Sequence, residues 1–354
     1  MNRQTIIYIT LTITAVFFLL TSCKKDYLSK NEKSSLFATP TTSELDNITN
    51  DWHSRNLTPT DYQVVQQADI FSGAFKLKIV SFIVNNIKQY GALVIPNTIN
   101  SVPVQILVGG FGLNITTNSF NLVLANSGSS EPRILAIPAL RGQSLQITIN
   151  GTIYTSPLSE GNHCDAFDRA TDDVLAFLNL IQQTETNADV SKTGVRGGSR
   201  GGTVALLAGI RDTRVKRVVG VLSPANMLEL TSHNENDATY QCQFLSNYKN
   251  GATTLEETRH NMIASSPIYF AQRLPLTQLH LGLRDVNVPI KQGYDIEEKI
   301  EATGNGSKFQ LFTYDKTHTD IATNNPELAK RIELFLSQLK CQQAMAADRM
   351  LLPP

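Results

Sequence analysis

The 354-residue sequence predicts an α/β fold, with a mostly parallel central sheet and helices on both faces. Two observations predict it. Short apolar runs rich in β-branched residues alternate with segments whose apolar residues recur every three or four positions. Such alternation is typical of a mostly parallel sheet that helices cover on both faces. With 41% hydrophobic residues, the chain can bury a sizeable core.

The predicted strands are the apolar runs, at 75–84, 91–96, 104–108, 133–138, 194–197, 215–222, 279–283 and 309–314. The predicted helices lie at 164–182, 202–210 and 290–302, followed by a last helix for which Asn325 is the cap and Pro326 the first residue. Residues 227–263 interrupt this alternation and are polar. We interpret them as a helical or irregular insertion after the sixth strand, either a lid on the site or a surface excursion.

The N-terminus has the pattern of an export signal. Arg3 precedes an apolar run from Ile6 to Leu20, which is too short to cross a bilayer comfortably and suits a signal peptide. The run ends in Thr21-Ser22-Cys23, which resembles the lipobox of bacterial lipoproteins. That resemblance implies cleavage before Cys23 and its lipidation, hence a membrane-anchored protein in the periplasm or at the cell surface. The alternative is an ordinary secretory signal with a chance cysteine.

Charge and cysteine content exclude several classes of partner and cofactor. Lys and Arg number 31, as do Asp and Glu, so the composition gives no reason to expect nucleic-acid binding. The chain contains no CxxC motif, and we expect neither a metal nor an organic cofactor. An oxidising compartment permits a disulfide among Cys164, Cys242 and Cys341, but packing roles are the simpler interpretation of all three.

One motif carries chemistry. Gly197-Gly198-Ser199-Arg200-Gly201 is a G-x-S-x-G sequence placed between a predicted strand and a predicted helix. A serine on such a sharp turn is lifted clear of the sheet, and glycines are needed because side chains two positions away would clash. Five-residue motifs of this kind also arise by chance, so the strand–turn–helix context is what makes it specific.

A reactive serine needs a general base, and the base needs a carboxylate to orient it. After Ser199, Asp285 follows a predicted strand within Gly282-Leu283-Arg284-Asp285-Val286-Asn287-Val288-Pro289. His318 follows the next strand along the chain. The order Ser, acid, His is that of α/β-hydrolases, and it predicts a triad of Ser199, Asp285 and His318. His280 lies inside a predicted strand, so we expect it to be structural.

These motifs resemble the catalytic domain of the prolyl oligopeptidase and dienelactone hydrolase group. The similarity covers the G-x-S-x-G-G elbow, the Ser266-Pro267 element, the G-x-x-D-x-x-V-P run and the strand before His318. It extends over roughly residues 75 to 340 and implies an α/β-hydrolase fold and a serine hydrolase. Two positions depart from the pattern: Leu281 stands where His is common, and Thr317 where Gly is common.

The same resemblance suggests an oxyanion hole made of backbone N–H groups. One comes from Arg200, and the other from Gly110 or Phe111 in the loop that follows an early strand. The alternative for that loop is a plain glycine turn. The Arg200 side chain either points into the helix or surface salt bridges, or it recognises an anionic substrate group.

The sequence thus predicts a signal peptide over 1–22, lipidated Cys23 with a flexible tether to residue 60, an α/β-hydrolase domain over 61–345 and a tail over 346–354. We expect acyl transfer from an ester to water. Only 52 residues separate Cys23 from the first predicted strand, too few for the propeller of classical prolyl oligopeptidases. That favours an esterase acting on carbohydrate-linked or small acyl esters. The alternatives are a small serine peptidase and a non-catalytic binding lipoprotein.

Overall fold

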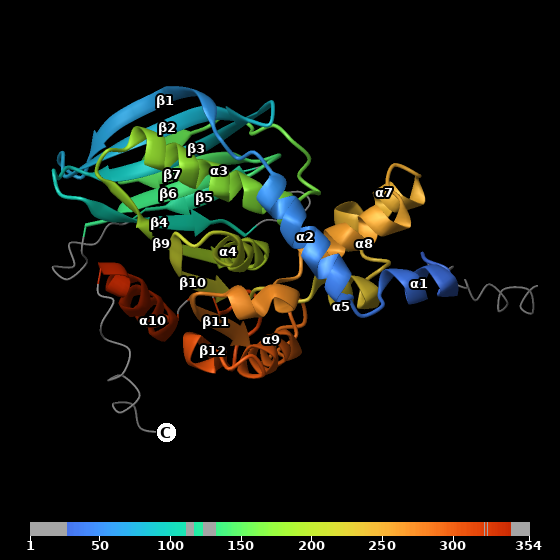
Figure 1. Cartoon of the computed structure of the whole chain (residues 1–354). Helices are drawn as coiled ribbons and strands as arrows, with labels where there is room; N and C mark the ends of the chain where they lie inside the picture. The colour runs from blue at the N-terminus through green and yellow to red at the C-terminus, as the bar shows by residue number, and fades with distance from the viewer. Residues whose placement is uncertain (1–26, 111–116, 123–131, 322, 324, 341–354) are drawn as a thin grey trace, which may run out of the picture.

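A nine-stranded sheet forms the centre of the computed structural model, which describes residues 27–110, 117–122, 132–321, 323 and 325–340 (Figure 1). In spatial order its strands are β1 (Thr60–Ile70), β2 (Phe75–Val84), β3 (Ile87–Pro96), β6 (Ile134–Ala139), β4 (Val102–Val108), β9 (Ala188–Gly198), β10 (Val215–Val221), β11 (Leu276–Gly282) and β12 (Phe309–Tyr314). The six strands from β6 to β12 are mutually parallel, whereas β1, β2 and β3 form an antiparallel meander that joins β6. The predicted mostly parallel α/β fold is confirmed.

Different layers cover the two faces of the sheet. On one face lie α3 (Asp168–Thr184), α4 (Arg200–Arg211) and α9 (Lys291–Glu301), which share a large apolar core with the central strands. On the other face, α10 (Pro326–Ser337) packs on β10 through Phe335 and Leu336. Asn325 caps α10, as predicted, by accepting from the Leu328 N–H. Short helices η2 (Pro267–Arg273), η3 (Gly306–Lys308) and η4 (Gln338–Lys340) complete the described helices of this half.

A second, three-stranded sheet covers β2, β3 and β6, and none of its strands was among those predicted. It comprises β5 (Thr117–Asn121), β7 (Ser144–Ile149) and β8 (Thr152–Thr155). Its side chains Leu145, Ile147 and Ile149 alternate along β7 and are buried against the main sheet. Strict alternation is the pattern of a half-buried strand, so the sequence did contain a signal for it.

The flexible tether predicted for residues 23–60 is wrong from Tyr27 onward. Two helices form there, α1 (Lys30–Leu36) and α2 (Thr42–Ser54), each started by a capping box in which a hydroxyl and a glutamate bond each other's backbone N–H. Leu36 and Ile48 are fully buried in the main core. Their polar composition suggested disorder, but few apolar residues suffice when every one of them is covered by the domain. The domain therefore begins before residue 61.

Buried ion pairs attach α2 to the sheet-covering helices. The Arg55 guanidinium lies 2.7 Å from an Asp168 carboxylate oxygen and 3.1 Å from one of Asp172. The indole N–H of Trp52 donates to Asp168 at 2.7 Å, and Arg211 of α4 completes the cluster. All these charged side chains are almost entirely inaccessible, so each carboxylate depends on its arginine partners for compensation.

Residues 227–263 are helical, comprising α5 (Met227–His233), α6 (Ala238–Tyr240), the π-helix η1 (Gln241–Leu245), α7 (Ser246–Lys249) and α8 (Leu255–Ala264). The N-terminal helices α1 and α2 lie beside them (Figure 1). Buried Arg259 of α8 donates to the carbonyls of Leu36 and Ala38 at 2.9 and 2.8 Å and pairs with Glu44 of α2. Lys33 of α1 pairs with Glu235 at 2.7 Å. We call α1, α2 and residues 227–264 the helical subdomain.

A disulfide joins this subdomain to the loop before α3. It links Cys164 to Cys242, so the expectation that both cysteines have only packing roles is wrong. Their separation of 78 residues hid the pairing from the sequence. Next to it, the rings of Phe167 and Phe244 stack at 6.1 Å. Cys341 and the predicted tail lie outside the described residues. No helix in the described ranges is both long and apolar enough to span a bilayer.

Because Arg259 satisfies several buried acceptors of α1 and α2, its loss should uncouple the N-terminal helices. We expect Arg259→Ala to lower the free energy of unfolding by about 2–4 kcal/mol. Urea unfolding followed by circular dichroism measures it. Exposed Arg273→Ala is the matched control and should change stability by less than about 0.5 kcal/mol. We call the contacts of Arg259 with α1 and α2 the clasp. Equal stability of the two variants would contradict its stabilising role.

Candidate active site

Three side chains from separate loops meet at one edge of the parallel sheet. Ser199 follows the last residue of β9, Asp285 lies three residues beyond β11, and His318 lies four residues beyond β12. Because β9, β11 and β12 are parallel and lie within four consecutive strands of the sheet, their carboxyl ends lie at the same edge. The structure therefore brings together the three residues that the sequence predicted as a triad.

The distances fit a proton relay. His318 Nε2 lies 3.1 Å from Ser199 Oγ, and His318 Nδ1 lies 2.7 Å from Asp285 Oδ2. The Asp285 side chain is inaccessible, whereas the His318 ring is about one-fifth exposed. Such an arrangement can remove a proton from the hydroxyl while the carboxylate fixes the imidazole tautomer.

The second oxygen of Asp285 is held by the backbone. Asp285 Oδ1 accepts from the N–H groups of Asn287 and Val288, both at 2.9 Å. These two donors fix the carboxylate in the plane that it presents to His318. Sequence reasoning missed them, since backbone donors depend on the turn rather than on side-chain identity. The loop itself was identifiable from the Val288-Pro289 end of the motif.

The acid and histidine loops are also bonded to each other. The Leu283 N–H donates to the Tyr314 carbonyl at 2.8 Å, and the Arg284 N–H donates to the Lys316 carbonyl at 3.1 Å. Beyond them, the Thr317 hydroxyl bonds Asp320 at 2.6 Å and shapes the turn that carries the histidine. Thr317 therefore builds this turn by a side-chain hydrogen bond where glycine is common in the resembling family.

The turn that carries Ser199 requires its glycines. Ser199 has φ 51° and ψ −125°, a region that residues with a side chain rarely adopt. A Cβ atom on Gly197 would lie 2.1 Å from the Gly201 carbonyl oxygen, and one on Gly201 would lie 2.4 Å from that of Gly109. Any side chain at either position would therefore push β9, α4 and the loop after β4 apart.

One predicted oxyanion donor lies at the start of a helix. Arg200 is the first residue of α4, so its backbone N–H points out of the helix N-terminus, where the dipole favours negative charge. Gly110 lies opposite, because a Cβ atom built on it would be 3.6 Å from Ser199 Cβ. Phe111 lies outside the described residues.

The Arg200 side chain packs beneath the helical subdomain. It is 5% exposed, and its guanidinium lies over the Phe167 ring at 5.5 Å from the centroid. Burial lowers its pKa to about 10, with Tyr240 of α6 opposing that shift. The group thus remains charged at neutral pH, and its contact with the Phe167 ring is a cation–π interaction.

The competing histidines occupy other places. His280 is fully buried, with Nδ1 at 2.9 Å from the Tyr314 hydroxyl, and burial lowers its pKa to about 3. A ring that stays neutral in this setting is structural, as predicted. His260 lies 3.5 Å from Asp51, between α8 and α2. Among the described residues, one group has metal-ligand spacing, His163 with Cys164 and Cys242, but its sulfurs form the disulfide.

The triad geometry generates a prediction for the nucleophile. A fluorophosphonate should label the wild-type protein at Ser199, because only an activated hydroxyl reacts readily. Ser199→Ala should lose both labelling and ester hydrolysis while keeping its circular dichroism spectrum. Labelling of the variant at the wild-type rate, read by intact mass, would exclude Ser199 as the nucleophile.

Acid and base are tested by separate variants. His318→Ala should lower kcat by about three or more orders of magnitude, because no other group takes the hydroxyl proton. Asp285→Asn should also cost a large factor in kcat by favouring the wrong imidazole tautomer. KM should change much less in both. His280→Ala is the control; loss of kcat in that folded variant, with His318→Ala nearly normal, would overturn the assignment.

Comparison with known proteins places this geometry in a family. The sequence matches the prolyl oligopeptidase family over residues 163–340, half of the chain. The segment contains all three triad positions, the disulfide and most of the helical subdomain. No curated protein sequence matches significantly.

Solved structures share the fold at low sequence identity. An acetyl xylan esterase from a Thermoanaerobacterium species has TM-score 0.61 and 16% identity over 88% of this chain and 99% of its own. One from a Paenibacillus species has TM-score 0.58 and 14% identity over 87% and 100%. Acylaminoacyl peptidase of Pyrococcus horikoshii has TM-score 0.56 and 17% identity over 75% of this chain and 41% of its own. The chain is an α/β-hydrolase-fold serine hydrolase and belongs to the prolyl oligopeptidase family.

Proposed function

We propose that the protein hydrolyses acyl esters of carbohydrates, acetyl esters first among them, through an acyl-enzyme on Ser199. The observation that carries this proposal is how much of each solved structure the shared fold covers. The fold agrees with an acetyl xylan esterase along nearly the whole of both chains, whereas it spans under half of the acylaminoacyl peptidase. The likeness in fold supports the esterase interpretation over a peptidase, and the substrate class is our inference from it.

The proposed reaction is acyl transfer to water. Ser199 Oγ attacks the ester carbonyl while His318 Nε2 takes its proton, and the sugar hydroxyl leaves with that proton. Asp285 orients the ring and stabilises the imidazolium. Water then attacks the acyl-serine, with His318 again as base, and releases the carboxylic acid. The Arg200 N–H and an N–H from the loop at 110–111 stabilise the oxyanion in both steps.

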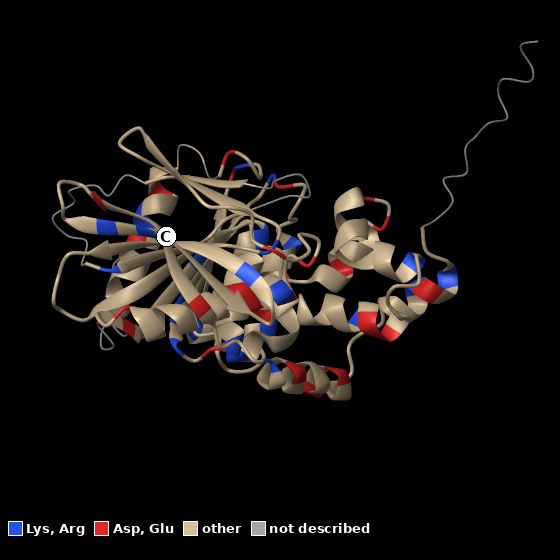
Figure 2. Cartoon of the chain, turned by 90° about the horizontal axis from the view of Figure 1, so that it is seen from above, with Lys and Arg blue, Asp and Glu red and all other residues tan. Residues whose placement is uncertain are grey.

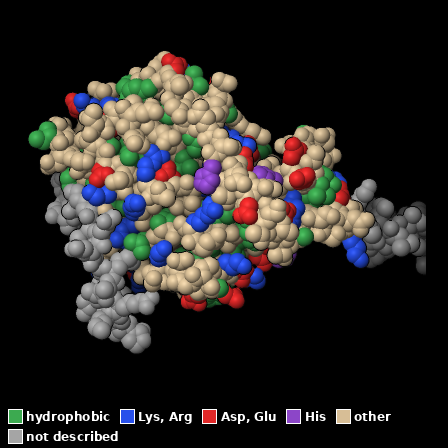
Figure 3. Space-filling view, in the orientation of Figure 1, with side chains coloured by type: hydrophobic (Ala, Val, Ile, Leu, Met, Phe, Trp, Pro, Cys, Tyr) green, Lys and Arg blue, Asp and Glu red, His purple; other side chains and the backbone are tan. Residues whose placement is uncertain are grey.

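Surface charge is compatible with a neutral substrate. Acidic and basic residues are mixed along the helices rather than gathered by sign (Figure 2). On the face seen in Figure 3, positive and negative side chains are likewise interspersed. A neutral ester would lose nothing to long-range repulsion there.

The substrate class can be tested with matched pairs of compounds. We expect acetate release from acetylated xylo-oligosaccharides, and hydrolysis of N-acyl dipeptide p-nitroanilides slower in kcat/KM by about a hundredfold or more. Amide cleavage is the decisive readout, since a peptidase also hydrolyses activated esters. The Ser199→Ala variant measures the background. Efficient anilide cleavage without acetate release would favour the peptidase alternative.

We also propose that the mature chain is a membrane-anchored lipoprotein, acylated at Cys23 and located in the periplasm or at the cell surface. Tyr27 is the first described residue and Leu28 is fully buried. Only Lys24, Lys25 and Asp26 therefore separate Cys23 from the folded domain. Four residue steps span at most about 14 Å, so the anchor would hold the helical subdomain close to the lipid surface.

Mass spectrometry of the mature N-terminus tests the anchor. The wild-type protein should carry a diacylglyceryl mass at Cys23 and partition into the detergent phase of a Triton X-114 separation. Cys23→Ala should be unlipidated and remain in the aqueous phase. Cys341→Ala is the matched control and should keep the lipid. A mature chain that begins elsewhere, with no lipid, would refute the proposal.

A further inference from the structure

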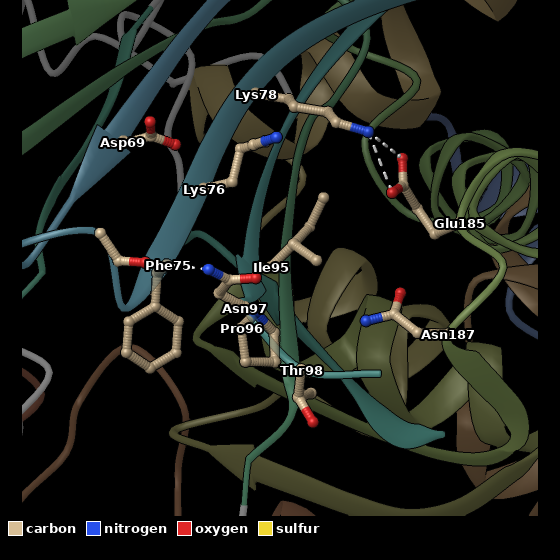
Figure 4. Close-up of a pocket in the computed structure, with 11 residues that line it drawn as sticks. Asp69, Phe75, Lys76, Lys78, Ile95, Pro96, Asn97, Thr98, Glu185 and Asn187 are labelled. Atoms are coloured by element: carbon tan, nitrogen blue, oxygen red, sulfur yellow. Dashed lines mark hydrogen bonds and ion pairs between the residues drawn. The ribbon is translucent and has the colours of Figure 1, made fainter. Parts of the chain in front are cut away.

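A cavity of about 480 Å³ lies at the end of the sheet remote from Ser199. It forms where the β1–β2 turn, the end of β3 and the loop between α3 and β9 meet (Figure 4). β9 starts at Ala188 near this cavity and ends at Gly198 next to Ser199. Beside it, β4 pairs with β9 from Val102 opposite Ala188 to Val108 opposite Gly197. Six residue steps of β4 place the two ends about 20 Å apart, so the cavity is separate from the triad.

Strand register explains why polar side chains gather there. Asp69 of β1, Lys76 of β2 and Ile95 of β3 are direct cross-strand partners and share one face of the sheet. Lys78 lies two residues further along β2, on the same face. This is the face that α3 covers, but α3 ends at Thr184, and beyond that point the face is open.

The charged groups of the cavity are balanced. Lys78 Nζ donates to both carboxylate oxygens of Glu185, at 2.9 and 3.0 Å. The side chains of Lys76 and Asp69 have no hydrogen bond or ion pair with the residues that the structure describes. Figure 4 shows the Lys76 amine pointing toward the side of the cavity where Lys78 and Glu185 lie. Two ammonium groups and two carboxylates therefore cancel.

The remaining lining combines polar and apolar groups. Asn187 and Thr98 supply an amide and a hydroxyl, and the buried Ile95 side chain supplies an apolar base (Figure 4). A simple anion would meet two carboxylates here, and a simple cation two ammonium groups. A sugar ring suits the mixture, because each hydroxyl both donates and accepts while the C–H face is apolar.

We propose that this cavity is a second, non-catalytic site that binds a neutral oligosaccharide segment. The choice of ligand class rests on the proposed carbohydrate esterase function. A polymer that reaches from this cavity to the triad gains a second contact at high effective concentration, whereas a small ester gains nothing. The cavity therefore makes the enzyme favour long acetylated chains through KM.

Calorimetry on the full mature chain tests the proposal. In a Ser199→Ala background, unacetylated xylohexaose should bind. The further double change Lys76→Met with Asn187→Ala should weaken this binding at the cavity by about tenfold, because two modest hydrogen bonds are worth about that factor. Lys308→Met, at the exposed far edge of the sheet, is the control and should bind like the parent. With Ser199 intact, the same pair of changes should leave kcat/KM for p-nitrophenyl acetate unaltered.

Two results would overturn the proposal: xylohexaose binding that the double variant does not weaken, or binding at the cavity of glycylglycine and not of xylohexaose. The assay is independent of ester hydrolysis. Acetate release without cavity binding would leave the esterase function standing and remove the second site. Cavity binding without acetate release would remove the esterase function and leave a saccharide-binding site.

Discussion

The backbone of Ser199 is the constraint on which the rest of the site depends. Its conformation costs about 1–3 kcal/mol, which the surroundings must supply. They do so through bonds on both sides: the Ser199 N–H donates to the Val221 carbonyl at 2.7 Å, and the Gly202 N–H donates to the Ser199 carbonyl at 2.9 Å. Strand β10 is thereby part of the nucleophile's support. Strand β10 pairs with β9 on one side and with β11 on the other, so it also fixes the position of β11, after which the loop of Asp285 begins.

Eight of the nine strands of the main sheet were predictable, because each is a short apolar run bounded by polar residues, glycine or proline. The runs 75–84 and 309–314 coincide with β2 and β12, and the others overlap their strands. The three triad positions followed from one motif and the chain order of two further strand ends. Their proximity is a matter of geometry, since parallel strands deliver their carboxyl ends to one edge. Their catalytic roles remain predictions.

The parts that the sequence did not reveal depend on contacts between distant residues. The segment at 30–54 looked like a linker because it is polar, yet Trp52 and Arg55 find partners on α3 more than one hundred residues away. Cys164 and Cys242 lie 78 residues apart. Neither a local sequence pattern nor a count of cysteines says which distant residues are in contact. Strand β1 was missed because its exposed edge carries few apolar residues.

The clasp around Arg259 also has a consequence for the order of assembly. The carbonyls of Leu36 and Ala38 lie 223 and 221 residues before the guanidinium that binds them. Helices α1 and α2 leave the ribosome first, but they cannot complete these bonds until α8 has been synthesised. Closing a loop of this length costs chain entropy before the contact repays it. The N-terminal helices therefore reach their final bonding only after most of the chain has been made.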